Sequence, residues 1–170
     1  MKKTNIHEVR NNHEVTIIEG VDYKVEATYD GISVWLLTSN KAFREESIFM
    51  ENCVGKMKEE KIVQDLDTSK EGRHFKAYQC GLRLMYSFRD PLDQNKPVAT
   101  LGLKRKTSTL PYRLGVIRGP SNKPVDKKYW NACCSFIEEL KNTEVYKPVI
   151  RHWFVAQMMQ SPGNDHHFLD

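Results

Sequence analysis

Alternating apolar and polar residues mark the middle of the chain as a run of β-strands. Between residues 82 and 89 apolar and polar side chains alternate, a period of two that predicts a strand with one buried face. One face carries Leu82, Leu84, Tyr86 and Phe88, and these alternate with Arg83, Met85, Ser87 and Arg89, of which only Met85 is apolar. Turn-forming residues at 89–95 end this run, and extended segments resume at 98–103 and 112–116. Three consecutive antiparallel strands, a meander, explain the pattern most simply.

The N-terminal part adds further strand-forming segments. Residues 15–18 and 23–29 are predicted to pair around a short turn at Glu19-Gly20, and residues 32–37 form another strand after Asp30-Gly31. The pattern leaves open whether these strands extend the later sheet or form a small one of their own. The expected fold class is α+β: an antiparallel sheet of five or six strands with helices packed on one face.

Helical patterns flank the central strands. Residues 41–61 have helical composition after candidate N-caps at 38–40, and Gly55 is expected to end or kink this helix. Pro124 lies in the first turn of a second helix, whose apolar stripe is Trp130, Cys133, Ile137 and Leu140. A helix beginning at Pro148 is apolar almost all round, so it is expected to pack deep in the fold or to form a homodimer interface.

Length and composition place these elements in one ordinary globular domain. The chain has 170 residues, of which 39% are hydrophobic and 28% charged. We expect a single domain at residues 15–160, a flexible N-terminus at 1–14 and a flexible tail at 161–170. No apolar run is long enough to span a membrane, and the first residues do not resemble a signal peptide. A cytoplasmic protein with no membrane partner and with four reduced cysteines is therefore expected.

Positive charge is concentrated in the second half of the chain. The segment 96–128 contains nine Lys or Arg residues and one Asp, a balance of +8, whereas the whole chain is +4 and the remainder is therefore −4. Such asymmetry predicts one face that binds an anionic partner, either nucleic acid or an acidic protein surface. The expected nucleic-acid contacts are Lys104, Arg105, Lys106, Arg113, Arg118 and Lys123. Tyr112, Tyr129 and Trp130 could add stacking surface, and the alternative is a solvated hairpin tip of no special function.

Cys53 is the sharpest candidate for a catalytic nucleophile. A reactive thiol needs a base and a nearby positive charge, and His74 is a base that the fold could bring beside it. The alternative is a small buried side chain packed on a helix, which is the commoner role of a single cysteine.

Arg89, Arg118 and Asn122 are candidates for binding a phosphate group. They fall at predicted strand or turn ends, where arginine offers a planar fork of donors and Gly119 permits close approach of the backbone. Arg89 could instead pair locally with Asp90, and Asn122 could be a turn residue. The histidines have no metal-ligand spacing and no nucleotide-binding loop occurs, so neither a metal nor a cofactor is expected.

Four short motifs occur in an order that resembles a known family. They are Glu51–Met57, Ser87–Asp90, Lys96–Leu101, and Ile117–Gly119 followed by Asn122 and Pro124. Together they resemble the PcfJ-like domain of proteins encoded by conjugative plasmids and phages, over roughly residues 45–140. Two positions depart from the family pattern: Asn52 replaces a usual histidine, and Gly115 a common glutamine. The resemblance implies a mobile-element setting and the handling of nucleic acid, but no defined reaction.

Two functions follow as hypotheses. The first is a small non-enzymatic binding protein whose basic face contacts nucleic acid or an acidic host protein, including a counter-defence role against a host nuclease complex. The alternative is an enzyme that acts on a nucleotide or phosphorylated substrate through Arg89, Arg118, Asn122 and Cys53.

Overall fold

A computed structural model describes residues 3–7, 14–55 and 70–143 of the chain. The predicted helix from Pro148 and the C-terminal tail lie outside these residues, and so does the homodimer interface assigned to that helix. The elements are β1 (Lys3–His7), β2 (Glu14–Ile18), β3 (Tyr23–Tyr29), β4 (Ile32–Leu37), α1 (Asn40–Met50), α2 (Arg73–Gln79), β5 (Arg83–Asp90), η1 (Pro91–Asp93), β6 (Lys96–Lys104), β7 (Arg113–Arg118), η2 (Pro120–Asn122) and α3 (Lys127–Lys141).

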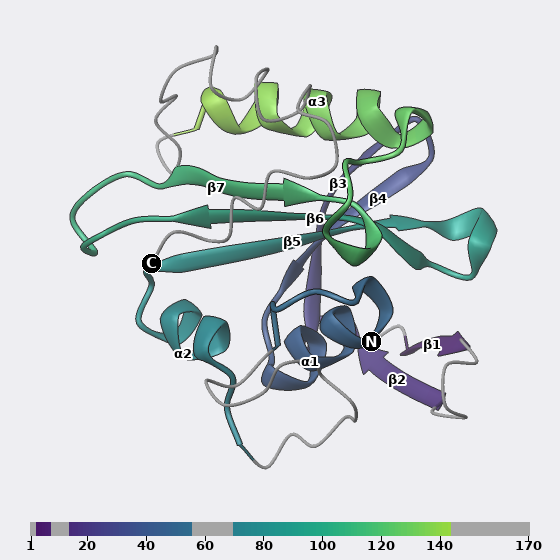
Figure 1. The fold of residues 1–170 in the computed structure, drawn as a ribbon, viewed down its shortest axis with the longest axis horizontal. Coiled ribbons are helices and arrows are strands. Elements are labelled where there is room, and N and C mark those ends of the chain that lie inside the picture. Colours follow the sequence, from purple (N-terminus) through teal and green to yellow (C-terminus); the bar gives the residue numbers. More distant parts are fainter. Residues whose placement is uncertain (1–2, 8–13, 56–69, 144–170) are drawn as a thin grey trace.

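A five-stranded antiparallel sheet forms the centre of the described structure (Figure 1). Its strand order, β3-β4-β5-β6-β7, follows the sequence, which confirms the predicted α+β class and the central meander. Strands β3 and β4 meet at Asp30 and Gly31, whose φ angles of 49° and 79° are typical of a two-residue hairpin turn. The N-terminal strands β3 and β4 therefore extend the later sheet.

Strands β1 and β2 form a separate two-stranded sheet, in which Lys3 pairs with Ile18 and His7 with Glu14. The predicted pairing of residues 15–18 with 23–29 is therefore wrong. The chain turns instead at Asp22, whose carboxylate accepts hydrogen bonds from the Ile18 amide at 2.8 Å and the Ser39 hydroxyl at 2.6 Å. Strand β1 also lies within the 1–14 segment that was expected to be flexible.

The helices cover both faces of the sheet, which corrects the expectation of helices on one face. Figure 1 shows α3 on one side and α1 and α2 on the other. On the α3 side, the Phe136 ring contacts Tyr86 and Phe88, with ring centroids 4.9 and 5.9 Å apart. On the other side, Met85 packs with α1 and α2 residues such as Phe43 and Phe75. Both faces of β5 are consequently buried from Met85 to Asp90, whereas Arg83 and Leu84 are partly buried.

Helix α3 confirms the predicted amphipathic stripe. Cys133, Ile137 and Leu140 are buried and Trp130 is partly buried against the same core. The helix starts later than the position of Pro124 suggested, because the Asp126 carboxylate accepts a hydrogen bond from the Lys128 amide and caps it there.

Helix α1 begins as predicted and ends earlier than predicted. Ser39 caps its start by accepting a hydrogen bond from the Ala42 amide at 3.0 Å. Its end is at Met50, because Glu51 adopts a left-handed conformation with φ 50°. The expected helix over 41–61 was thus too long. Gly55 folds back onto the helix instead of ending it, and a Cβ there would lie 2.5 Å from the Arg44 Cα.

Candidate nucleic-acid interface

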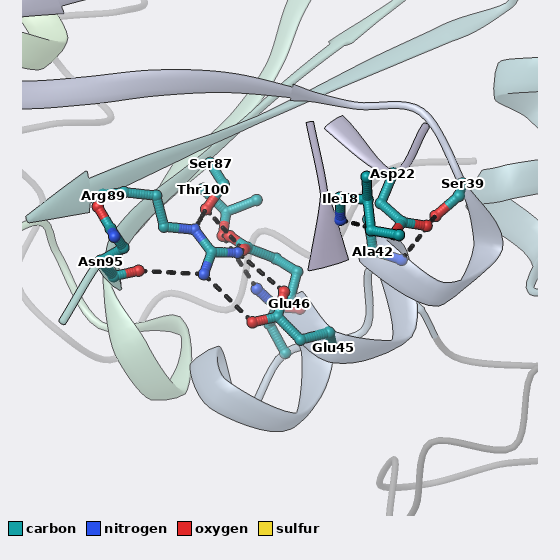
Figure 2. A network of polar contacts seen from close by, with 11 residues as sticks. Ile18, Asp22, Ser39, Ala42, Glu45, Glu46, Ser87, Arg89, Asn95 and Thr100 are labelled. Carbon is teal, nitrogen blue, oxygen red and sulfur yellow. Dashed lines mark hydrogen bonds and ion pairs between the residues drawn. The ribbon is translucent and has the colours of Figure 1, made fainter. Parts of the chain in front are cut away.

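A buried network of charged and polar side chains joins α1 to β5 and β6 (Figure 2). At its centre the Arg89 guanidinium donates to both carboxylate oxygens of Glu45, at 3.2 and 2.9 Å, and to Glu46 at 2.9 Å. The Arg89 side chain is 0% exposed, as are those of Glu45 and Glu46. Arg89 also donates to the Asn95 carbonyl at 3.2 Å. Every contact of this guanidinium is therefore inside the protein.

The network continues through hydroxyl groups to the turn that follows α1. Ser87 donates to Glu46 at 2.6 Å and accepts from Arg89, while Thr100 donates to the other Glu46 oxygen. The Asn52 amide donates to Thr100 at 3.3 Å, and its carbonyl oxygen accepts from the Val54 backbone at 3.0 Å. Asn52, which stands at the usual histidine position of the resembled family, thus links the sheet to the turn that contains Cys53.

Two carboxylates share one guanidinium in this network, and this imbalance affects Glu46. Burial raises the pKa of Glu46, and the charge of Glu45 raises it further, against the lowering effect of Arg89 and of the Ser87 and Thr100 hydroxyls. The pKa of Arg89 is raised by the two glutamates although burial lowers it. Arg89 is therefore not placed to bind a substrate phosphate, and its predicted local ion pair with Asp90 is replaced by these glutamates.

The structure brings Cys53 and His74 together, as the sequence allowed. The Cys53 Sγ lies 3.9 Å from the His74 Nε2, with His74 buried at the start of α2. Burial lowers the pKa of His74 to about 3, and the charges of Arg83 and Arg73 contribute to the lowering. His74 is consequently a neutral imidazole at physiological pH and a weak base, which favours a structural role for the contact.

Three cations lie side by side across the strands at one end of the sheet. In the strand register Arg83 is opposite Lys104, and Lys104 is opposite Arg113, so the three side chains are on the same face of neighbouring strands. We call Arg83, Lys104 and Arg113 the cation row. It lies on the α2 face, because Met85, two residues from Arg83, packs there. The side chain of Lys104 passes over Gly115, where a Cβ would lie 3.5 Å from it.

The loop after β6 divides the predicted basic cluster. Lys106, two residues after Lys104 in the chain, is exposed, whereas Arg105 stacks on Tyr112, with its guanidinium 4.3 Å from the ring centroid. Arg105 also donates to the Gly81 carbonyl at 2.6 Å. These contacts attach the loop to the start of β5, so Arg105 serves the fold and is not part of the cationic surface.

Arg118 and Lys123 lie at the opposite end of β7. Arg118 is opposite Thr100 and donates to the Ile117 carbonyl at 3.2 Å. Arg118 is the fifth residue after Arg113, which corresponds to about 16 Å along a strand. Lys123 and Asn122 are exposed at and after η2, a segment attached to α1 by a hydrogen bond from Ser121 to Glu51. Apart from Arg105, the predicted nucleic-acid contacts therefore form two groups, one with Lys104, Lys106 and Arg113 and the other with Arg118 and Lys123.

Sequence reasoning missed Arg83 as a member of the cationic surface. Its place in the alternating pattern at 82–89 was recognised, but its pairing with Lys104 depends on the register between β5 and β6. The alternation did contain the necessary signal, because the chain bends at residues 91–95 and the strands on either side must pair. Arg73 and Lys76 are exposed on α2, which the sequence did not predict.

The predicted stacking residues do not lie on this surface. Tyr112 is 5% exposed, and Tyr129 and Trp130 pack against the core under α3. Among the described residues no group of three His, Cys, Asp or Glu side chains is arranged to hold a metal ion. The same part of the chain contains no helix of the length and apolar character needed to cross a membrane.

Comparisons of the chain with protein-family models, with curated proteins and with solved structures find no match. The resemblance to the PcfJ-like family therefore stays a prediction. The structure does place its motifs around one point, since Asn52, Ser87, Arg89 and Thr100 come from three of the four motifs and belong to one hydrogen-bond network.

Proposed function

We propose that this protein is a nucleic-acid-binding module that contacts the phosphate backbone through the cation row and Lys106. The observation that supports this most directly is the cross-strand register, which gathers Arg83, Lys104 and Arg113 on one face. Like charges directly opposite each other destabilise a sheet. Their accumulation at one place gives this end of the sheet a local positive charge, which favours an anionic ligand.

Phosphates suit this surface better than the carboxylates of an acidic protein. Two members of the row are arginines; the Nε atom of Arg83 is buried, whereas the partly exposed guanidinium of Arg113 can donate two parallel hydrogen bonds to a phosphate. A row of charges at the spacing of neighbouring strands, about 4.8 Å, also matches a regular polyanion better than scattered acidic side chains. The alternative partner is an acidic host protein, and the titrations described next distinguish it from nucleic acid.

The test is a titration of labelled DNA and RNA by fluorescence anisotropy at low and at physiological salt. The variant Lys106→Gln/Arg113→Gln should bind more weakly and should reduce the slope of log K against log salt by about 1.8, since each lost phosphate contact removes about 0.9. The matched control, Lys24→Gln/Lys127→Gln, removes the same charge from exposed positions elsewhere and should keep the wild-type slope.

The proposal is overturned if wild-type protein binds no nucleic acid at low salt, or if the two double variants behave alike. Binding to an acidic polypeptide such as polyglutamate but to no nucleic acid would indicate a protein partner instead. Thermal melts of both variants exclude unfolding as the cause of any loss.

A second candidate function is the enzyme acting on a nucleotide or phosphorylated substrate. The contact between Cys53 and His74 at 3.9 Å favours it. It ranks second because Arg89 is enclosed and His74 is a weak base. Denaturing gels of the titration mixtures test it. Strands that are shortened by the wild-type protein and remain intact with Cys53→Ser would support the enzyme. Strands that remain intact with the wild-type protein exclude strand cleavage.

The biological setting is part of the proposal and rests on the family resemblance alone. A phage or plasmid protein that binds nucleic acid in the host cytoplasm could shield it from a host nuclease complex. A nuclease-protection assay with the wild type and the Lys106→Gln/Arg113→Gln variant would test this counter-defence role, because protection should be lost together with binding.

A further inference from the structure

We infer that the ligand of this surface is a duplex nucleic acid, held by its phosphates without stacking on the bases or reading their sequence. The inference rests on the proposed function and deepens it. It follows from which side chains accompany the cation row and from the shape of the elements that present it.

Two aromatic side chains belong to the elements next to the cation row, Tyr112 directly before β7 and Tyr78 on α2, and both pack against other side chains of the protein. Proteins that bind single strands usually combine positive charge with exposed aromatic rings on which bases stack. Here Tyr112 lies beneath Arg105 on the other face, with its hydroxyl donating to the Gly81 carbonyl at 2.6 Å. Tyr78, on α2, packs between Phe43 and Phe75, at centroid distances of 5.9 and 6.0 Å. The Tyr112 ring is 5% exposed and the Tyr78 ring is partly buried by its aromatic contacts, so neither is a fully exposed stacking platform.

The cation row also lies on the face of a sheet, which does not fit into the major groove of a duplex. Sequence is read in the major groove by a helix or a two-stranded ribbon that reaches base edges. Arg83 and Lys104 lie instead on the face of a five-stranded sheet, and Arg113 lies on its edge strand β7. The loop that could have projected, residues 105–112, is attached to Gly81 by Arg105. Arginines on such a face reach phosphates, which carry no sequence information directly.

Charge density favours a duplex over a single strand. Three strands at about 4.8 Å spacing make the row about 10 Å wide. A duplex carries one charge per about 1.7 Å of its axis and a single strand one per about 3.4 Å, so the same width faces roughly six charges or roughly three. A further cation outside the row, Arg118, lies on the same face, about 16 Å from Arg113 along β7. That separation corresponds to about five base-pair steps of a duplex strand.

The test compares four ligands with wild-type protein: an A·T duplex, a G·C duplex, a single strand of equal length, and inorganic polyphosphate as competitor. We expect the two duplexes to bind within about three-fold of each other, well below the discrimination of a base-reading protein. The single strand should bind more weakly, and polyphosphate should displace the duplex. With the cation row, Lys106 and Arg118 in contact with the duplex, five cations in all, the slope of log K against log salt should approach about −4.5.

A preference of ten-fold or more between the two duplexes, tighter binding of the single strand, or failure of polyphosphate to compete would each overturn the inference while leaving nucleic-acid binding in place. Absence of binding to every nucleic acid would overturn the proposed function itself. All four measurements use the unmodified protein, so no outcome depends on whether a variant folds.

Discussion

Replacing Arg89 by methionine should be the most destabilising single change on the sheet. Methionine keeps much of the arginine volume but removes the charge that Glu45 and Glu46 share. The two carboxylates, both fully buried, would then face each other without a counterion. Ser87 and the Asn95 carbonyl would also lose their donor, at 2.6 and 3.2 Å in the wild type.

The magnitude follows from the cost of leaving buried charge uncompensated. Removing one member of a buried ion pair costs about 3–5 kcal/mol, a large part of the about 5–15 kcal/mol that stabilises a typical domain. For a protein of this size about 1 kcal/mol shifts Tm by about 2–4 °C, so Tm should fall by roughly 6–20 °C. Thermal unfolding followed by circular dichroism at neutral pH measures this shift directly.

Two further variants separate the network from a general effect of losing an arginine. Arg113→Met removes a partly exposed arginine from a neighbouring strand and should change stability by less than about 0.5 kcal/mol. The triple variant Arg89→Met/Glu45→Gln/Glu46→Gln removes the uncompensated charges and should recover much of the loss. Equal melting temperatures for Arg89→Met and Arg113→Met would refute the buried network.

Three other predictions test the electrostatics and the packing. Because the pKa of Glu46 is raised in the folded state, the stability that Glu46 contributes is present below about pH 4.5 and is lost as pH rises through the folded pKa. Urea titrations should show the free energy of unfolding declining over this range in the wild type and declining less in Glu46→Gln. The imidazole of His74 should stay neutral down to about pH 3 in an NMR titration, and proton uptake near pH 6.5 would contradict the burial of its ring. Gly55→Ala should destabilise by about 1–3 kcal/mol, because its Cβ would lie 2.5 Å from the Arg44 Cα, whereas Gly31→Ala meets no atom within 4 Å and has only its φ of +79° against it.

The elements with apolar periodicity could be predicted from the sequence. Strands β4 to β7 and helix α3 each have one face that packs in the core under α3, and this face produces the alternation or the stripe. The turn at Asp30-Gly31 was equally evident, since both residues adopt positive φ readily. Helix α2 has only seven residues and β1 only five, which is too short for a periodic pattern to be recognised.

The buried network could not be predicted from hydrophobic patterning, because the side chains of α1 and of β5 that form it are both polar. In β5 the alternation predicts that Ser87 and Arg89 lie opposite the buried face, and Glu45 and Glu46 in α1 are of a residue type that is mostly exposed. Each set is buried only because it meets the other, so hydrophobic patterning assigns both wrongly. The phosphate-binding role predicted for Arg89 from its place at a strand end is wrong, because its guanidinium is enclosed by the two glutamates. Its partners lie 43 and 44 positions away, a separation that no local pattern reports.

The network and the cation row depend on the same strand register. Ser87 is opposite Thr100 beneath α1, and four residues back along β5 Arg83 is opposite Lys104 in the cation row. A slip of one residue would turn every side chain to the other face and place Lys104 under α3. The hydrogen bonds from Ser87 and Thr100 to the two oxygens of Glu46 oppose that slip. Arg89→Met should therefore weaken nucleic-acid binding only as far as it unfolds the protein, and Kd measured well below its Tm should equal the wild-type value.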